Sequence, residues 1–247
     1  MAISSLETNK LDHQSPMLRM GSVAFLVGIV IIVVSTIFHA SSEDLTDHWV
    51  VFAVYAESDP WIAAHLGQFA GVMLIFAGGF VALYRLLARS ESNTLSALAS
   101  LGFALTIMAA STFAILQAVD GIALKRAVDS WAAAPVGEEK AIAFRVAEGI
   151  RWIEIGINSI NRIIQGAVAI VFGLAIAKST HLSRWIGAFG VFAGASTLIA
   201  GVSVAYVGFS SSVAVVGDIS TVTSFAWLVI LGILMWRKTS AANIMTR

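Results

Sequence analysis

Six long apolar stretches divide the chain and alternate with polar connections. Each stretch is long enough to cross a bilayer as a helix, because a hydrocarbon layer of about 30 Å needs about 20 apolar residues. The runs are continuous and lack the short alternating segments of a membrane β-barrel. The pattern therefore predicts an all-α, polytopic membrane protein with a bundle of six transmembrane helices. The predicted spans cover about residues 20–39, 63–86, 95–120, 155–177, 185–207 and 213–236.

Composition supports a bilayer environment and excludes several classes of function. Of the 247 residues, 58% are hydrophobic and 12% are charged, and this charged share is about half that of soluble domains. The formal net charge is zero, whereas nucleic-acid-binding domains present a basic face. The chain has no cysteine, which excludes disulfides, iron–sulfur clusters and cysteine-type zinc sites. Lipid is thus an expected partner, and nucleic acid is not.

The Lys and Arg content of the connections predicts the orientation. Nine Lys and Arg residues lie in the N-terminal segment, the second and fourth connections and the tail, whereas the first connection has five acids and no Lys or Arg. The third connection has four Lys and Arg residues, accompanied by four acids. Because cytoplasmic loops are enriched in Lys and Arg, both termini are predicted to be cytoplasmic. This divides the chain into cytoplasmic segments 1–19 and 239–247 and a transmembrane domain 20–238, with outer segments 40–62 and 121–154.

A stripe of polar side chains follows one edge of the fourth span. At 100° per residue these positions fall within an arc of about 120°, and isoleucines occupy the opposite side. A charge at mid-bilayer costs about 3 kcal/mol on insertion scales, so the stripe is expected to face protein or water. The stripe consists of Glu148, Arg151, Glu154, Asn158, Arg162 and Gln165.

The helix that carries this stripe is predicted to be longer than the bilayer is thick. Over 138–177 it would contain 40 residues and extend about 60 Å. Its first part is expected either to project beyond the outer surface or to kink at Gly149 or Gly156. Glu148 and Arg151 are then expected to lie at the membrane interface.

Other polar residues lie at a similar depth in the outer halves of neighbouring spans. With the stripe they predict a polar chamber, open to the outside, that binds a small polar solute or ion for transport or sensing. In an alternative interpretation, Arg162 and Glu154 pair with each other or with Asp120 and only fix the helix register. The expected chamber residues are Gln68, Gln117, Asp120, Glu154, Asn158, Arg162, Gln165 and Asp218.

Three histidines surround the acidic first connection and suggest a metal site. His39 and His65 end adjacent antiparallel spans at matching depth, and His48 lies between them in the chain. Imidazoles beside carboxylates suit zinc, copper or iron. A bis-histidine haem held by His39 and His65 is a second possibility. The sequence contains no H-E-x-x-H or E-x-x-H motif, so this prediction depends on position alone.

Small residues in the fifth span predict a close contact with another helix. Gly187, Gly190, Gly194 and Gly201 lie along "GAFGVFAGASTLIAG", and small residues let helix backbones approach closely in membranes. Ordinary contact within the bundle is the favoured interpretation.

Two segments resemble a known type of protein. The stretches "LSRWIGAFGVFAGASTLIAG" (182–201) and "HLGQFAGVMLIFAGGFVALYRLL" (65–87) are similar to uncharacterised bacterial multi-pass proteins catalogued as domains of unknown function. Those proteins also have about six spans and a Leu-Ser-x-Trp-Ile/Leu-Gly opening. The resemblance implies a location in the bacterial cytoplasmic membrane and transfers no activity.

Three hypotheses for the function follow. The first is a solute- or ion-handling protein that uses the polar chamber. The second is an interaction or scaffold subunit, forming a homo-oligomer or joining a membrane-protein partner. The third is a metal- or haem-binding membrane oxidoreductase with a histidine site at its outer face. The sequence contains no phosphate-binding glycine loop and no Gly-x-Ser-x-Gly nucleophile motif that would assign an enzyme class.

Overall fold

The protein is built from helices joined by short turns. The computed structural model describes residues 15–39, 44–88 and 92–245, and this part of the chain contains no strand. Six helices are long and apolar enough to cross a membrane, which confirms the expected all-α, six-span architecture. They cover Pro16–Ile37, Trp61–Ala88, Asn93–Ala133, Glu138–Lys178, Arg184–Val207 and Ser211–Thr239.

Two of the long helices contain a π-helical turn, and one short helix lies outside the six. In chain order the elements are α2 (Ser15–Ile37), α3 (His48–Ala56), α4 (Trp61–Met73), the π-helical segment η1 (Leu74–Phe80), α5 (Val81–Ala88), α6 (Asn93–Gln117), the π-helical segment η2 (Ala118–Leu124), α7 (Lys125–Ala133), α8 (Glu138–Lys178), α9 (Arg184–Val207) and α10 (Ser211–Met245).

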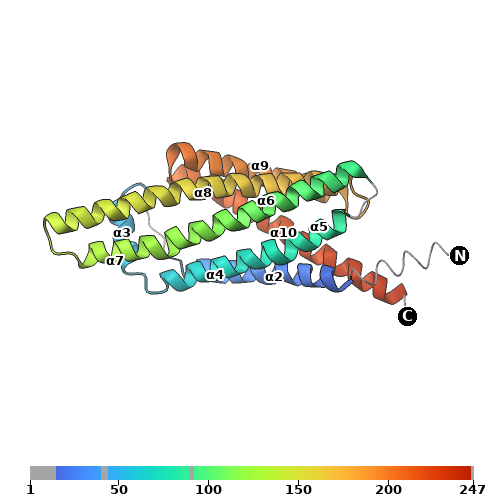
Figure 1. Cartoon of the computed structure of the whole chain (residues 1–247), viewed down its shortest axis with the longest axis horizontal. Coiled ribbons are helices and arrows are strands. Elements are labelled where there is room, and N and C mark those ends of the chain that lie inside the picture. The colour runs from blue at the N-terminus through green and yellow to red at the C-terminus, as the bar shows by residue number, and fades with distance from the viewer. Residues whose placement is uncertain (1–14, 40–43, 89–91, 246–247) are drawn as a thin grey trace.

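The molecule is elongated, and its two ends differ. The start of α2 and the end of α10 lie at one end, here called the terminal end (Figure 1). At the other end α7 and the first part of α8 extend beyond the bundle and carry the short helix α3. We call α3, α7 and residues 138–153 of α8 the cap, and the end that carries it the cap end.

Local sequence explains where several helices begin and end. Asp47 is the N-cap of α3, and its carboxylate accepts hydrogen bonds from the backbone N–H groups of Trp49 and Val50. Ser183 caps α9 in the same way. Such caps satisfy donors that have no partner within the helix. Gly208 ends α9 with a φ of 71°, a conformation that costs glycine little.

A long and close helix contact joins α8 and α9 through small residues spaced seven apart. A Cβ atom added at Gly194 would lie 2.5 Å from the Gly166 carbonyl oxygen, and one added at Gly187 would lie 2.5 Å from that of Gly173. The third contact places Gly201 on Ser159, whose hydroxyl donates to the Gly201 carbonyl oxygen at 2.9 Å. Seven residues make about two helical turns, so these positions form one straight seam. The small residues of the fifth span thus pack within the bundle, as expected.

This seam also sets the heights of the two helices. Because Gly201 packs on Ser159 and the helices are antiparallel, Val207 at the end of α9 lies level with about residue 153 of α8. The preceding part of α8 therefore projects about 24 Å beyond α9. Projection of this part beyond the membrane surface stays a prediction. The helix runs without interruption through Gly149 and Gly156.

Two of the three hydrophobic clusters in the described part of the chain are large. The larger lies within the bundle and includes Phe25, Phe80, Phe172 and Trp227. The smaller lies in the cap and includes the buried rings of Phe52, Tyr55, Trp61, Trp131 and Phe144. Trp61 and Trp131 are 0% and 5% exposed. They are therefore core residues.

Candidate functional site

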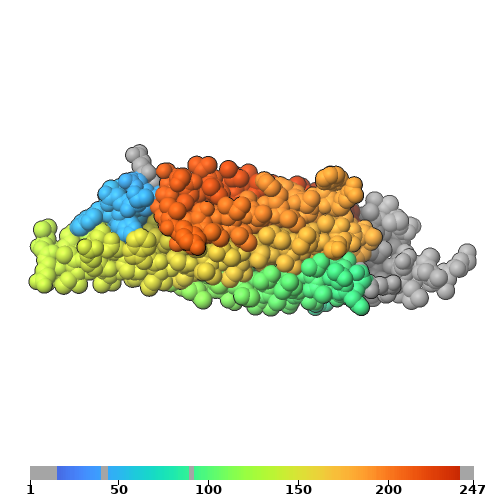
Figure 2. All heavy atoms as spheres, turned by 90° about the horizontal axis from the view of Figure 1, so that it is seen from above, coloured from blue at the N-terminus to red at the C-terminus, as the bar shows by residue number. Residues whose placement is uncertain are grey.

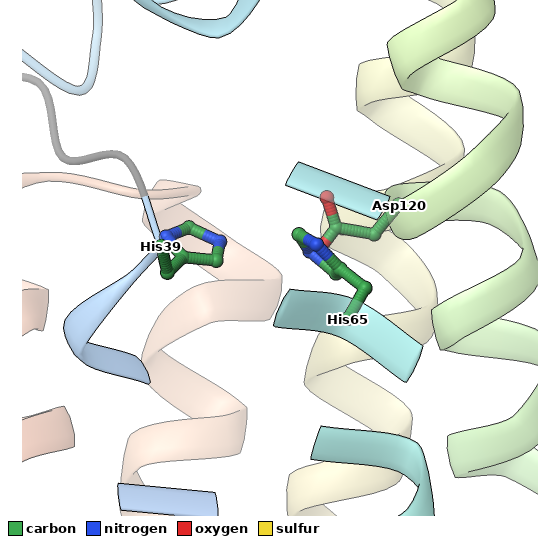
Figure 3. A group of neighbouring side chains, drawn as sticks. All are labelled: His39, His65 and Asp120. Atoms are coloured by element: carbon green, nitrogen blue, oxygen red, sulfur yellow. The ribbon is translucent and has the colours of Figure 1, made fainter. Parts of the chain in front are cut away.

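The buried end of α4 meets η2 and the end of α2 at the base of the cap, where three possible ligand groups converge. Each of His39, His65 and Asp120 offers one ligand atom, and these atoms lie within 4.8 Å of one another. The rings of His39 and His65 face each other across 4.9 Å between centroids. Figure 3 shows the Asp120 carboxylate reaching the His65 ring from the neighbouring helix. The structure thus brings together two of the three predicted metal-ligating histidines and adds Asp120.

The hydrogen bonds of His65 define which of its nitrogens is available. Its Nδ1 lies 2.8 Å from the Trp61 carbonyl oxygen. A carbonyl oxygen only accepts hydrogen bonds, so Nδ1 carries a proton and donates. In the neutral ring Nε2 therefore presents a lone pair. A backbone acceptor on Nδ1 is the usual way in which proteins orient a histidine that binds a metal through Nε2.

Nε2 of His65 lies close to the Asp120 carboxylate. It lies 3.1 Å from Oδ2 of Asp120, yet it has no hydrogen-bond partner among the described residues. The distance is suitable for a hydrogen bond, so the angles are what exclude one. The other carboxylate oxygen of Asp120, Oδ1, is also buried and has no partner in the described part of the chain. Buried polar atoms are normally satisfied, so these two indicate a missing partner.

Packing around this group fixes the rings in place. The Trp61 ring is fully buried and stacks against His65 at 4.5 Å and His39 at 4.7 Å between centroids. Its Nε1 donates to the Asp120 carbonyl oxygen at 3.2 Å. Gly121 follows in η2, and a Cβ atom there would lie 2.5 Å from Cβ of His65. The π turn and the absent side chain together allow Asp120 to approach His65. π-helical turns often occur at functional sites.

His48, the third histidine predicted as a ligand, lies elsewhere. It begins α3 on the cap, and its Nδ1 lies 3.4 Å from Oε1 of Glu148. Its ring stacks on Phe52 and meets the edge of Trp152. The structure therefore separates His48 from His39 and His65.

The polar stripe of α8 faces the interior at its centre. Arg151 donates to Glu154 at 2.6 Å, and each side chain is 3% exposed. The guanidinium carbon lies 4.7 Å from the centroid of Phe209 and 5.5 Å from that of Tyr55. Arg151 is thus buried within the protein, and its expected position at the membrane interface stays a prediction. The alternative interpretation paired Glu154 with Arg162 or Asp120, whereas the ion pair in the structure joins Glu154 to Arg151.

Further along the stripe, Arg162 contacts neutral groups. Its Nε donates to the Asn158 side chain at 3.0 Å and its Nη1 to the Ser220 hydroxyl of α10 at 3.4 Å. Asp218, expected in the same chamber, is exposed on α10. Its charge acts on Arg162, although the two side chains are not in direct ion-pair contact among the described residues. Arg162 therefore bridges α8 and α10 through hydrogen bonds.

The remaining predicted chamber residues are dispersed. Gln68 donates to the Thr36 hydroxyl at 3.5 Å, and Gln165 is half-buried on α8. Gln117 is buried, and its Oε1 has no partner among the described residues. An open groove of about 590 Å³ lies on the cap beside His48, and none of the eight predicted chamber residues lines it. A polar chamber shared by all eight residues stays a prediction.

Sequence reasoning missed two residues that organise the cap. Lys125 is buried and donates to the Tyr55 and Ala56 carbonyl oxygens at 3.1 Å each, and to Asp129 at 2.6 Å. A cation at these last carbonyls complements the C-terminus of α3. Burial raises the pKa of Tyr55 to about 12, so this phenol stays neutral. The sequence signal for Lys125 was weak because nothing in the chain pairs residue 125 with α3.

These observations define a multi-pass membrane protein with a helical cap and a partly buried histidine–carboxylate site at the base of that cap. The chain belongs to the family described as a domain of unknown function, DUF4386, whose match covers residues 20–238. This assignment confirms the expected resemblance to uncharacterised multi-pass proteins. Comparisons with curated proteins and with solved structures found no significant match.

Proposed function

We propose that this membrane protein binds a divalent transition-metal ion through His39, His65 and Asp120. The observation that carries the proposal is the convergence of three ligand atoms, one each from His39, His65 and Asp120, within 4.8 Å of one another. Nε2 of His65 and Oδ1 of Asp120 are buried there and have no hydrogen-bond partner among the described residues. A metal ion bound at this point would satisfy both atoms, because it accepts lone pairs from imidazole nitrogen and carboxylate oxygen.

The ligand types favour zinc or a similar ion. Imidazole nitrogens suit zinc, copper, iron and nickel, whereas magnesium and calcium prefer oxygen ligands. Ligand bonds of about 2.0–2.2 Å require only small side-chain rotations from the present spacing of at most 4.8 Å. A haem is less suitable, because the His39 and His65 rings are 4.9 Å apart and both pack on Trp61, which leaves no room for a macrocycle.

The sequence predicted that the protein binds a small polar solute or ion. The proposed site makes this function more specific, because its ligand is a transition-metal ion. We infer from the Lys and Arg distribution that the cap end faces away from the cytoplasm. The connection at 40–62 has five acids and no Lys or Arg. Its negative charge would then attract cations from that side. A role in ion transport or sensing accords with such a site. The wider solute chamber, an oxidoreductase activity and a homo-oligomeric or scaffold role stay predictions.

Zinc titration of the purified protein tests the proposal. The protein is stripped with chelator in detergent, dialysed and titrated with Zn²⁺ against a chromophoric indicator, with metal content measured by mass spectrometry. We expect one Zn²⁺ per chain. His65→Ala and Asp120→Asn each remove a ligand, and binding should weaken at least about tenfold.

His48→Ala and His181→Ala serve as matched controls, since each removes a histidine outside the three-residue group. Both should bind Zn²⁺ as the unmodified protein does. Two results would contradict the proposed metal site: a folded His65→Ala variant that binds Zn²⁺ with unchanged affinity, or an unmodified protein that binds much less than one Zn²⁺ per chain.

A further inference from the structure

A groove on the cap follows α8 from the water-exposed end of the molecule to the level of the bundle. Phe144, Glu148, Trp152 and Ile155 line it at helical spacing on one side, and the cavity has a volume of about 590 Å³. Figure 2 shows α3 seated on the first half of α8, beside the cap-end termini of α9 and α10. The groove's opposite wall is built from these two parts: residues 45–49 before and within α3, and residues 207–209 after α9.

The two halves of the groove suit different environments. The half of the groove lined by Trp152, Ile155 and Val207 is here called the lower half. Val207 is level with about residue 153 of α8, as the contact between α8 and α9 shows, so this half lies where the apolar bundle ends. Exposed apolar and aromatic side chains border this half: Trp152 is 57% exposed, Tyr206 87% and Val207 62%. Aromatic side chains at such a boundary are typical of a membrane interface. The upper half lies in the cap, beyond the end of α9.

Charged groups gather in the upper half with both signs present. Arg145 donates to Glu148 at 2.6 Å, and its side chain is 75% exposed. Glu148 also lies 3.4 Å from the His48 ring, and Asp47 completes the lining. The groove lining therefore contains two carboxylates and one arginine. A ligand that matches this lining carries an anionic group for Arg145 and a cationic group for the acids.

Aromatic rings flank the carboxylates. Trp49 stacks on Phe144 with centroids 4.4 Å apart, and Trp152 meets the His48 ring at 5.3 Å. Aromatic faces attract ammonium groups, and a nearby carboxylate adds to that attraction. The cavity's volume falls within the range of about 300–1,000 Å³ of small-molecule sites, which is sufficient for a phospholipid headgroup.

We propose that this groove binds a phospholipid with a primary-amine headgroup, phosphatidylethanolamine, from the adjacent leaflet. Its phosphate lies on Arg145, its ammonium lies between Glu148 and Asp47, and an acyl chain descends past Trp152 and Val207 into the bilayer. The two carboxylates oppose a purely anionic headgroup such as that of phosphatidylglycerol. This site is independent of the proposed metal site.

Native mass spectrometry in detergent tests the proposal with lipids of identical acyl chains. The full chain is titrated in parallel with phosphatidylethanolamine, phosphatidylglycerol and the soluble headgroup glycerophosphoethanolamine. We expect phosphatidylethanolamine to be retained at least about tenfold better than phosphatidylglycerol, and the soluble headgroup to compete at least about tenfold less well than the lipid, because it lacks the acyl chain.

Variants locate the binding. Glu148→Gln should reduce the preference for phosphatidylethanolamine over phosphatidylglycerol about tenfold, since it removes a charge-assisted contact, and Trp152→Ala should weaken retention of both lipids. Trp185→Ala is the matched control, because Trp185 is a 71% exposed tryptophan at the terminal end of the bundle. It should bind like the unmodified protein. Each variant is first shown to have an unchanged melting temperature.

Three results would overturn the proposal. Equal retention of the two lipids would exclude the headgroup assignment. Unchanged binding by Glu148→Gln and Trp152→Ala would move the lipid to another surface. Competition by the soluble headgroup at the same concentration as the lipid would identify a site for a soluble phosphoamine.

Discussion

Arg151 and Glu154 are a buried ion pair beneath the cap, packed between the rings of Tyr55 and Phe209. Removing two charges from water is costly, and a mutual contact of 2.6 Å recovers that cost only while both partners remain. Nε of Arg151 has no partner within the described part of the chain. We therefore expect the pair to define the packing of α3, α8 and the α9–α10 turn more than it adds to overall stability.

Single and double substitutions separate these two effects. Arg151→Met leaves a buried carboxylate without its partner, so we expect unfolding to become easier by about 3–5 kcal/mol. The double variant Arg151→Met/Glu154→Leu replaces the pair by apolar groups and should fall within about 1.5 kcal/mol of the unmodified protein. Denaturant unfolding in detergent measures both changes.

The chain provides a matched control for this experiment. Arg145 and Glu148 have the same i, i+3 spacing on α8 and the same 2.6 Å contact, but the Arg145 side chain is 75% exposed. Arg145→Met should cost no more than about 1 kcal/mol, as exposed pairs do. Equal losses in Arg151→Met and Arg145→Met would contradict the importance of burial.

At the level of elements, the seam between α8 and α9 determines the height of the cap. Its three contacts repeat every seven residues on both helices, so one straight line of small residues fixes the register of two long helices. The hydrophobic pattern specified which residues face the interior. The contact partner of each glycine was not specified, because a glycine can pack equally well on any neighbouring small residue.

The same chemical change should have opposite effects at two glycines of these helices. A Cβ atom at Gly194 would lie 2.5 Å from the Gly166 carbonyl oxygen, whereas one at Gly149 would have no atom within 4 Å in the described part of the chain. Gly194→Ala should destabilise the protein by about 1–3 kcal/mol through overpacking. Gly149→Ala should stabilise it by about 0.5–1 kcal/mol through helix propensity.

Melting temperatures of the two variants in the same detergent provide the comparison. Gly156→Ala repeats the Gly149 test, since a Cβ atom at this position also has no neighbour within 4 Å among the described residues. If Gly194→Ala were as stable as Gly149→Ala, the close approach of α8 and α9 would be incorrect.

At the level of the whole molecule, six spans bring the first and the last helix to the same side of the membrane. Figure 1 shows the start of α2 and the end of α10 together at the terminal end. Geometry alone does not say which side this is. The distribution of Lys and Arg supplies the inference that it is the cytoplasm. The proposed metal site and lipid groove would then both face away from the cytoplasm.

Single-cysteine labelling tests the orientation, and the absence of native cysteine makes the background low. Val136 is 96% exposed in the turn before α8, and Thr180 is exposed in the turn after it. In intact cells a membrane-impermeant maleimide should label Val136→Cys and leave Thr180→Cys unlabelled until the cells are permeabilised. The reverse labelling would invert the molecule and place the cap in the cytoplasm.

The sequence by itself determined that the protein lies in a lipid bilayer, that it is built from helices, and that the polar stripe of α8 faces the interior. Length and apolar content are local properties that the bilayer selects directly, and a helical period of 3.6 residues places every third or fourth residue on one face. These properties predicted six spans, the projection of α8 and the proximity of His39 and His65. They also identified Asp120 as an outer polar residue at a comparable depth.

Only the tertiary structure decided which polar residues meet. Asp120 joins His65 because a π turn and Gly121 alter the helix at that point, and no pattern in the chain announces a π turn. His48 leaves the metal group because α3 packs on the cap core, which depends on contacts between distant segments. Side-chain pairing across helices depends on register and rotation, and shifts of a single residue change both. The histidine–carboxylate site therefore emerged from packing, although each of its residues was visible in the sequence.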